Sequence, residues 1–384
     1  MTATTPPAGT SQEPRPAPGT GPQAPRPAED PTHSWADLVT RLLAGEHLSG
    51  AHTAWVMSQV VSGMATSAQV AGFLIALRAK GETGVEIGGL VEALLGHATR
   101  VRVPGTTVDI AGTGGDRSGA VNVSTMAAIV AAAAGVRVVK HGGRAASSST
   151  SGSADVLEHL GVRLDLPPER AARVAVKAGI TFLFAPRYNP GLRHVAAIRR
   201  ELAVPTAFNI LGPLVNPALP THQVVGVADA RMAPVIADVL ALRGASALVV
   251  RGDDGLDKLT TVTTSRVWVV GAGVATSTRF DPRALAIPAA DPGALRGGDA
   301  AENARVVEAL LDGKPGPVSD VVLLNAAAVL AAADPTGALD PTPEGLTGRL
   351  AAHLVRCAEA VDSGAARETL RRWVAATHSG QLRE

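Results

Sequence analysis

The sequence predicts an α/β protein in which a small all-helical domain precedes a large α/β domain with a mainly parallel sheet. In residues 35–103, apolar residues recur every three or four positions, which is the spacing of amphipathic helices. From residue 104 onward, short β-branched runs alternate with alanine-rich helical stretches, as in parallel strands covered by helices. A chain of 384 residues with 46% apolar residues has enough apolar side chain for both cores.

The first 34 residues form a separate part of the chain. They carry nine of the 27 prolines and show no apolar periodicity, so we expect a disordered, proline-rich arm at 1–34. Such a segment could also be a ligand for an aromatic groove. Solvated tails of this composition are commoner, and we favour that interpretation.

The helical domain should contain four short helices between residues 35 and 100. Helix starts are indicated by Ser34, by Thr66 and by the capping box of Thr83 with Glu86. No strand is expected within this segment, so it must pack on itself and on another surface. We expect a helical domain at 35–103 that forms a dimerisation face.

The α/β domain is expected at 104–384. Its predicted helices lie at about 124–135 and 154–160, and the helical segment 299–377 should complete the cover of the sheet. The predicted strands are 107–110, 136–139, 181–184, 224–227, 247–250 and 267–270.

Charge and cysteine content exclude several classes of protein. With 35 Lys and Arg against 34 Asp and Glu, the net charge of +1 provides no field to hold nucleic acid. The single Cys357 cannot form an internal disulfide or a CxxC metal site. No signal pattern begins the chain, and the most apolar stretch, 129–139, contains Arg137 and is too short to cross a bilayer. We expect a cytoplasmic protein without a membrane span.

A first chemically informative segment, 108–116, runs from an apolar strand into the sequence Gly-Thr-Gly-Gly-Asp. Glycines let backbone N–H groups approach an anion closely. Asn122, Ser124 and Thr125 follow where a helix should begin, and their donors would join the unpaired N–H groups of its first turn. The pattern predicts a phosphate cradle, although such a turn is often only a tight turn.

Two further segments also follow predicted strands, so all three should meet at one sheet edge. Residues 140–155 bring the charges of Lys140 and Arg144 and a run of hydroxyl groups, unless they are simply a flexible serine-rich loop. In residues 251–258, Asp254 and Asp257 could hold Mg²⁺, although Asp-Asp-Gly is also an ordinary turn. Together the segments indicate a ligand with several phosphates, a divalent metal and no covalent nucleophile.

In order and spacing, these segments resemble the anthranilate phosphoribosyltransferase family from residue 35 to about 377. Other matching stretches are Ala-Gly-Phe-Leu-Ile-Ala-Leu-Arg-Ala-Lys-Gly-Glu-Thr at 71–83, Phe-Ala-Pro at 184–186, Phe-Asn-Ile-Leu-Gly-Pro-Leu-Val-Asn-Pro at 208–217 and Gly-Gly-Asp-Ala-Ala-Glu-Asn-Ala at 297–304. The resemblance implies the nucleoside phosphorylase and phosphoribosyltransferase type of fold, with helices from 190–205 able to join the helical domain. It also implies a homodimer.

The activity implied by the resemblance is a step of tryptophan biosynthesis: the 5-phosphoribosyl group moves from phosphoribosyl pyrophosphate (PRPP) to the amine of anthranilate, and pyrophosphate leaves. No catalytic acid or base is expected, because positioning and electrostatics would supply most of the rate. The resemblance assigns Mg²⁺ to Ser124 and Asp257, and the acceptor, anthranilate or a related aromatic acid, to His141, Gly143, Tyr188, Asn189 and Arg199. PRPP would meet Gly112, Thr113, Gly114, Gly115, Asp116, Asn122, Ser124, Thr125, Lys140 and Ser148.

Three residues depart from the family pattern. The family usually has Asn at Gly143, His at Asn189 and Glu at Lys258, and the serine-rich loop is one residue longer here. At Lys258 a metal-binding carboxylate becomes an ammonium. Each unit-charge interaction is worth on the order of 4 kcal/mol at ~4 Å and an effective dielectric constant of ~20. We therefore expect one Mg²⁺ to be lost, and one hypothesis is that Lys258 contacts pyrophosphate directly in its place.

Other functions are compatible with these departures. The chain could be a paralogue with a different acceptor in specialised metabolism. It could also be a non-catalytic relative that binds nucleic acid or a protein partner, or a nucleoside phosphorylase. Near-neutral charge argues against nucleic acid, and Arg199, in its family context, argues for an aromatic carboxylate over inorganic phosphate.

Overall fold

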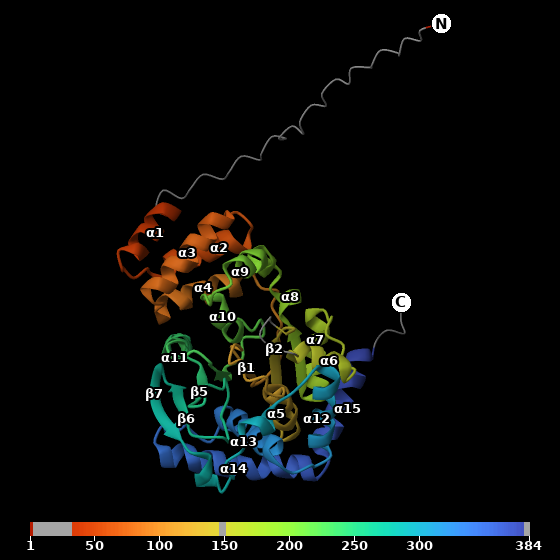
Figure 1. Cartoon of the computed structure of the whole chain (residues 1–384). Coiled ribbons are helices and arrows are strands. Elements are labelled where there is room, and N and C mark those ends of the chain that lie inside the picture. The colour runs from red at the N-terminus through yellow and green to blue at the C-terminus, as the bar shows by residue number, and fades with distance from the viewer. Residues whose placement is uncertain (3–32, 146–150, 380–384) are drawn as a thin grey trace.

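The computed structural model describes residues 1–2, 33–145 and 151–379. A bundle of helices lies at one end of the molecule and a large sheet covered by helices at the other (Figure 1). The arrangement confirms the predicted fold class. The proline-rich arm falls almost entirely outside the described residues, as does Ser148 of the serine-rich loop.

The N-terminal bundle consists of α1 (Trp35–Leu43), α2 (Gly50–Val61), α3 (Ser67–Lys80) and α4 (Gly84–His97). Ser34, Thr66 and Thr83 cap the helices at the predicted positions. The cap of α4 is part of a buried network, because the Glu86 carboxylate also accepts hydrogen bonds from Lys80 Nζ at 2.7 and 2.8 Å. Paired in this way, a charged side chain can be buried at the helix start.

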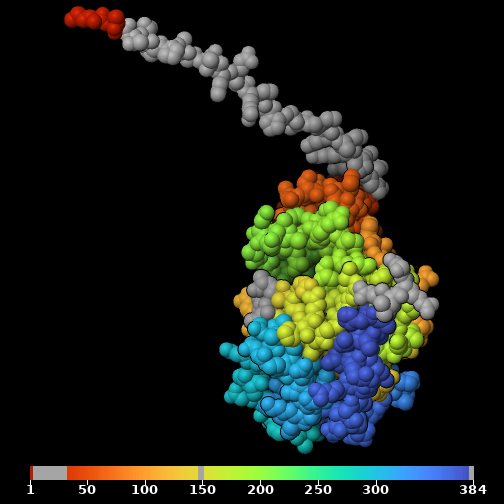
Figure 2. Space-filling model, turned by 90° about the vertical axis from the view of Figure 1, so that its right-hand side faces the viewer, coloured from red at the N-terminus to blue at the C-terminus, as the bar shows by residue number. Residues whose placement is uncertain are grey.

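A later segment of the chain packs against this bundle. A 3-10 helix, Pro190–Val195, leads into α9 (Ala196–Leu202), and Val195 and Ile198 belong to the same hydrophobic core as α1 to α4. The close approach requires Gly191, where a Cβ would lie 2.7 Å from Cβ of Val61. Figure 2 shows this segment, in green, against the red and orange helices.

The sheet contains seven strands in the order β3-β2-β1-β4-β5-β6-β7. The first five strands in sequence are parallel, and β6 and β7 are antiparallel to their neighbours, so the sheet is mainly parallel as predicted. The strands are β1 (Val108–Gly112), β2 (Val138–Gly142), β3 (Ile180–Phe184), β4 (His222–Gly226), β5 (Ser246–Gly252), β6 (Ser265–Gly271) and β7 (Val274–Phe280).

The sequence prediction missed β7. This edge strand is mostly exposed and reads Val-Ala-Thr-Ser-Thr-Arg-Phe, so it lacks the apolar run expected of a buried strand. In the structure, Ala272 (φ 50°) and Gly273 (φ 77°) both have positive φ and join β6 to β7 as a tight hairpin. Two-residue hairpin turns require this left-handed geometry.

Helices cover both faces of the sheet (Figure 1). On one face lie α5 (Val123–Ala133), α13 (Pro317–Ala332), α14 (Pro343–Asp362) and α15 (Ala365–His378), which bury one core. On the other, α11 (Met232–Leu242) shares a second core with the N-terminal bundle. Because that core is continuous, the bundle is held against α11, which covers this face of the sheet. The remaining helices are α6 (Ser153–His159), α7 (Pro168–Ala178), α8 (Ala185–Tyr188), α10 (Phe208–Leu211) and α12 (Ala300–Leu311).

Glycine ends four of the five parallel strands at their carboxyl edge: Gly112, Gly142, Gly226 and Gly252. Ligands of open α/β sheets bind outside this edge.

No helix in the described part of the chain is long and apolar enough to span a membrane.

Candidate active site

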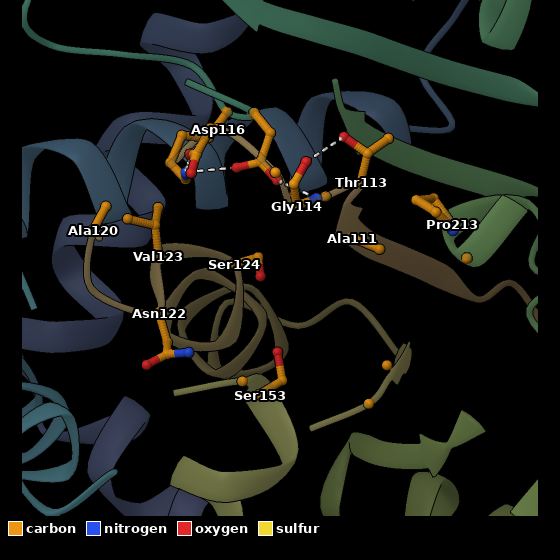
Figure 3. Close-up of a pocket in the computed structure, with 18 of the residues that line it drawn as sticks. Ala111, Thr113, Gly114, Asp116, Ala120, Asn122, Val123, Ser124, Ser153 and Pro213 are labelled. Carbon is orange, nitrogen blue, oxygen red and sulfur yellow. Dashed lines mark hydrogen bonds and ion pairs between the residues drawn. The ribbon is translucent and has the colours of Figure 1, made fainter. Parts of the chain in front are cut away.

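A cavity of about 380 Å³ opens at the carboxyl ends of β1, β2 and β5, and all three predicted loops contribute to its wall. Thr113, Gly114 and Asp116 line one side, with Asn122, Ser124 and Ser153 across the opening (Figure 3). Cavities of this size accommodate small phosphorylated ligands. The predicted convergence of the three loops is therefore present in the structure.

The first loop is joined to the third by direct contacts. Gly114 (φ 67°) and Gly115 (φ 82°) take the left-handed conformation that favours glycine, and the Gly114 N–H donates to Asp257 Oδ2 at 2.8 Å. A Cβ on Gly112 would overlap Oδ2 of Asp257, and one on Gly226 would overlap the Asp257 backbone. The strand ends are glycine because Asp257 packs directly on them.

Asp116 and Asp257 share one cation, the side chain of Lys258. Its Nζ lies 2.8 Å from Asp116 Oδ2 and 2.6 Å from Asp257 Oδ1. Burial lowers the pKa of Lys258, but the charges of Asp257 and Asp116 outweigh this effect and raise it above its ordinary value. The side chain therefore stays an ammonium at neutral pH.

The start of α5 forms the opposite wall. Asn122 is fixed in place, since its amide donates to Ser151 O at 3.1 Å and its oxygen accepts from Asn303 at 2.8 Å. Ser124 lines the cavity, whereas Thr125 is buried and donates to Ser153 Oγ at 3.0 Å. Of these side chains, Asn122 and Ser124 are placed to meet a ligand directly, while Thr125 supports the wall from behind.

Lys140 lies beneath this wall rather than in it. Its ammonium donates to Ile110 O at 2.6 Å and to Ser124 Oγ at 3.2 Å, and the side chain is buried. Burial lowers the pKa of Lys140 to about 8, against the opposing charges of Asp109 and Asp257. Lys140 orients the Ser124 hydroxyl and brings a positive charge close to the glycine loop.

His141 and Gly143 line the cavity on the side toward α10. His141 Nδ1 lies 3.2 Å from the Gly212 carbonyl oxygen, so Nδ1 carries the proton, and Nε2 faces the Asn189 amide nitrogen at 3.5 Å. Burial lowers the pKa of His141 to about 4, which keeps the ring neutral. At Gly143, a Cβ would meet nothing within 4 Å. The missing side chain thus leaves open space in the cavity.

The other predicted acceptor residues differ in position. Arg199 of α9 lines the cavity, with its guanidinium 5.8 Å from the centre of the Phe208 ring. Asn189 is buried behind His141. Tyr188 is fully buried, and its hydroxyl donates to Leu166 O at 2.7 Å, so it lies in the core and outside the cavity wall formed by the described residues.

Two charged residues from the loops have structural partners. Arg144 lines the cavity but pairs with Glu158 at 2.5 Å and Asp155 at 3.1 Å. Asp254 accepts from the Leu256 N–H at 3.1 Å and the Thr260 hydroxyl at 2.7 Å. These hydrogen bonds support the interpretation of Asp-Asp-Gly as an ordinary turn. Asp254 therefore organises the third loop and is not a candidate metal ligand.

Sequence reasoning missed a buried polar pair behind the site. Asp109, within β1, accepts from the His141 N–H at 3.3 Å and from the Asn216 amide at 2.8 Å. Burial raises the pKa of Asp109 to about 6, against the lowering effects of Lys140 and Asn216. An acid in the middle of an apolar strand was the available signal. Asp109 and Asn216 together join β1 to β2 beneath His141.

A second cavity, of about 310 Å³, lies beside the first and shares Gly114, Asp116 and Asn209 with it. Its basic residue Arg78 already pairs with Asp229 at 2.9 Å and with Glu82 at 3.6 Å. This cavity lacks the start of α5 and the His141 side, so it suits an anionic sugar less well than the first.

Two family models match the two parts of the chain. One, described as the helical bundle domain of a glycosyl transferase family, matches residues 36–98, and its α/β domain counterpart matches residues 104–367. An anthranilate phosphoribosyltransferase of Streptomyces griseus is 58% identical over 90% of this chain and 96% of its own length. One of Thermobifida fusca is 57% identical over 89% of this chain and 96% of its own. The chain belongs to the anthranilate phosphoribosyltransferase family.

Solved structures of the family have the same fold. The anthranilate phosphoribosyltransferase of Thermus thermophilus superposes with a TM-score of 0.81 at 40% identity, covering 89% of this chain and all of the other. The Saccharomyces cerevisiae enzyme in complex with PRPP and Mg superposes at 0.78 with 27% identity, covering 90% of this chain and 98% of the other. The chain therefore shares the family fold over about nine-tenths of its length.

Proposed function

We propose that this protein transfers the 5-phosphoribosyl group of PRPP to the amine of anthranilate and releases pyrophosphate. The observation that carries the proposal is the single cavity where the glycine loop after β1, the start of α5 and the loop after β5 meet. Relatives 54–58% identical to this chain are anthranilate phosphoribosyltransferases, which favours anthranilate over the rival acceptors and over a non-catalytic role.

In this reaction the amine nitrogen attacks C1′ of the ribose, the bond from C1′ to pyrophosphate breaks, and the new ammonium loses a proton. Anthranilate is already a nucleophile, so the protein has to hold both substrates in line and stabilise the charge of the leaving group. The first loop and the start of α5 suit a pyrophosphate anion, because both line the cavity and the first turn of a helix leaves backbone N–H groups without partners inside the helix. Lys140 adds charge behind them.

The metal requirement can be tested against the residues present. Mg²⁺ prefers one or two protein oxygens together with phosphate oxygens and water, and the Ser124 hydroxyl at the cavity wall would supply one such oxygen beside the Lys140 ammonium, which donates to it at 3.2 Å. When bound with PRPP, Mg²⁺ neutralises charge on the departing pyrophosphate. A second ion at Asp257 fits poorly, because its oxygens already accept from Gly114 N–H and Lys258. No group of three or more His, Cys, Asp or Glu within the described ranges could hold a metal.

The acceptor would lie on the side of His141, Gly143 and Arg199. The Arg199 guanidinium can bind a carboxylate with two parallel hydrogen bonds. Because His141 is neutral, it does not compete with Arg199 for the carboxylate of the acceptor. Anthranilate would then place its amine toward the sugar that the phosphate loops hold.

The direct test is release of pyrophosphate from PRPP on addition of anthranilate, compared with a panel of other aromatic acids. We expect release with anthranilate and formation of a product whose mass equals anthranilate plus the phosphoribosyl group. No release with any acid would contradict the enzyme class, and release with another acid alone would contradict the acceptor.

We further infer that the protein is a homodimer that pairs through its helical bundle. Support comes from the exposed apolar side chains of that bundle, which include Ile75 and Val85. Light scattering should give twice the monomer mass, and the double variant Ile75→Asp, Val85→Asp should give the monomer mass.

A cytoplasmic location, which the sequence predicts, stays a prediction.

A further inference from the structure

We propose that the Lys258 ammonium takes the place of a metal ion between Asp116 and Asp257 and donates to the pyrophosphate of PRPP, so that the protein binds PRPP with a single divalent cation. This inference rests on the proposed function. It concerns how this chain, with Lys258 where its family usually has Glu, holds the leaving group.

The position of the ammonium is that of a shared cation. Nζ lies 2.8 Å from Asp116 and 2.6 Å from Asp257, two carboxylates that also accept from the backbone N–H groups of Ser118 and Gly114. The three side chains are 13%, 14% and 10% exposed for Lys258, Asp116 and Asp257, and all three residues line the cavity. The ammonium stabilises this group because the two mostly buried carboxylates repel each other.

Charge counting shows why a second metal is not needed. Asp116, Asp257 and Lys258 together carry a net charge of −1, whereas a glutamate at 258 would make the group −3. A group of −3 attracts a divalent ion, and a group of −1 that already contains an ammonium repels one at the same position. The loop therefore keeps its acidic residues in place without metal.

The ammonium also has a donor left for the substrate. An ammonium has three N–H groups, and within the described residues Lys258 uses two of them, for Asp116 and Asp257. Its side chain lines the same cavity as Gly114 and Ser124, where the proposed function puts the pyrophosphate. Lys258 is thus in a position to contact a phosphate oxygen directly, as a point charge fixed by two carboxylates.

The test measures PRPP binding by isothermal titration calorimetry, without acceptor, across a series of Mg²⁺ concentrations at which free PRPP already carries one Mg²⁺. For the natural protein, the PRPP Kd should not change with Mg²⁺. For Lys258→Glu, the Kd should fall in proportion to Mg²⁺, since a second ion must bind. Lys177→Glu, the same charge change on an exposed lysine of α7, should behave like the natural protein.

A count of metal ions gives a second readout. In crystals of the PRPP complex grown with Mn²⁺, anomalous scattering should show one manganese in the natural protein and two in Lys258→Glu. Two ions in the natural protein, or equal Mg²⁺ dependence of the two proteins, would overturn the proposal. Absence of PRPP binding to the natural protein at any Mg²⁺ concentration would instead refute the proposed function.

The neutral variant Lys258→Gln covers the case in which Lys258→Glu does not fold. It removes the ammonium and adds no carboxylate, so the PRPP Kd should rise by about tenfold to a hundredfold, the loss expected for a charged hydrogen bond. An unchanged Kd in this variant would show that Lys258 does not contact the substrate.

Discussion

The backbone N–H of Gly114 donates a 2.8 Å hydrogen bond to Oδ2 of Asp257, which joins the glycine loop after β1 to the acidic loop after β5. These residues are 143 positions apart in the sequence. The contact holds the glycine loop opposite the start of α5 across the cavity (Figure 3). The conformation of the predicted phosphate cradle therefore depends on the third loop as well as on its own glycines.

Gly112→Ala tests this dependence. The added Cβ would overlap the Asp257 carboxylate, so the third loop has to shift away from the cradle. We expect the PRPP Kd to rise more than tenfold, with a loss of about 1–3 kcal/mol in the free energy of unfolding from the overpacked contact. Calorimetry and denaturant unfolding would measure the two effects. Gly212→Ala is the control, since its Cβ meets nothing within 4 Å on the same cavity wall; equal effects of both variants would refute the account.

Arg199→Gln should affect the acceptor and not PRPP. Loss of a charge-assisted hydrogen bond of about 1.5–3 kcal/mol corresponds to a rise of about tenfold to a hundredfold in the KM for anthranilate. Arg200, the next residue on α9, lies outside the cavity wall that the described residues form, so Arg200→Gln should leave both constants unchanged. A rise in the PRPP Kd for Arg199→Gln, with the KM for anthranilate unaltered, would show that Arg199 binds PRPP and not the acceptor.

Gly143→Asn should restore the side chain that the family usually has. The space beyond Gly143 is open, so the amide can enter the cavity without overlap. One added hydrogen bond of about 1 kcal/mol would lower the KM for anthranilate about fivefold, and the added bulk should weaken turnover of larger aromatic acids. Steady-state kinetics with anthranilate and a bulkier analogue would measure both. If the variant accepts the bulkier acid better, the cavity does not extend past Gly143 as described.

His141 should make the stability of the protein fall in mild acid. Its pKa is about 4 when folded and 6.5 in the unfolded chain, so between these values the unfolded state binds more protons and stability falls as the pH decreases. Between pH 7.5 and 5 this amounts to about 2 kcal/mol. Asp109, with a pKa raised to about 6, acts in the opposite sense, so the comparison needs a variant.

The variant is His141→Gln, which cannot titrate. Its free energy of unfolding, measured in urea at pH 7.5 and pH 5, should decrease by about 2 kcal/mol less than that of the natural protein. A decrease of the same size in both proteins would mean that His141 titrates normally in the folded state and is not held neutral by burial.

The sequence was sufficient to predict the fold class, the capped helices and the loops at the strand ends, because these depend on local patterns. Thr83 with Glu86 and the glycine loop at 112–115 are examples. Features set by tertiary contacts were not predictable. The Tyr188 hydroxyl donates to Leu166 O in the core, and the edge strand β7 is mostly exposed, so it lacks the apolar run by which a buried strand is recognised. The pairing of Lys258 with Asp116 spans 142 residues and exists only once the loops have met.

A crystal structure of the complex with PRPP tests the central claim most directly. The account predicts pyrophosphate bound between the Gly114 loop and the start of α5, with C1′ of the ribose turned toward His141 and Arg199. PRPP found in the neighbouring cavity beside Arg78 and Asp229, or with C1′ turned away from Arg199, would contradict it.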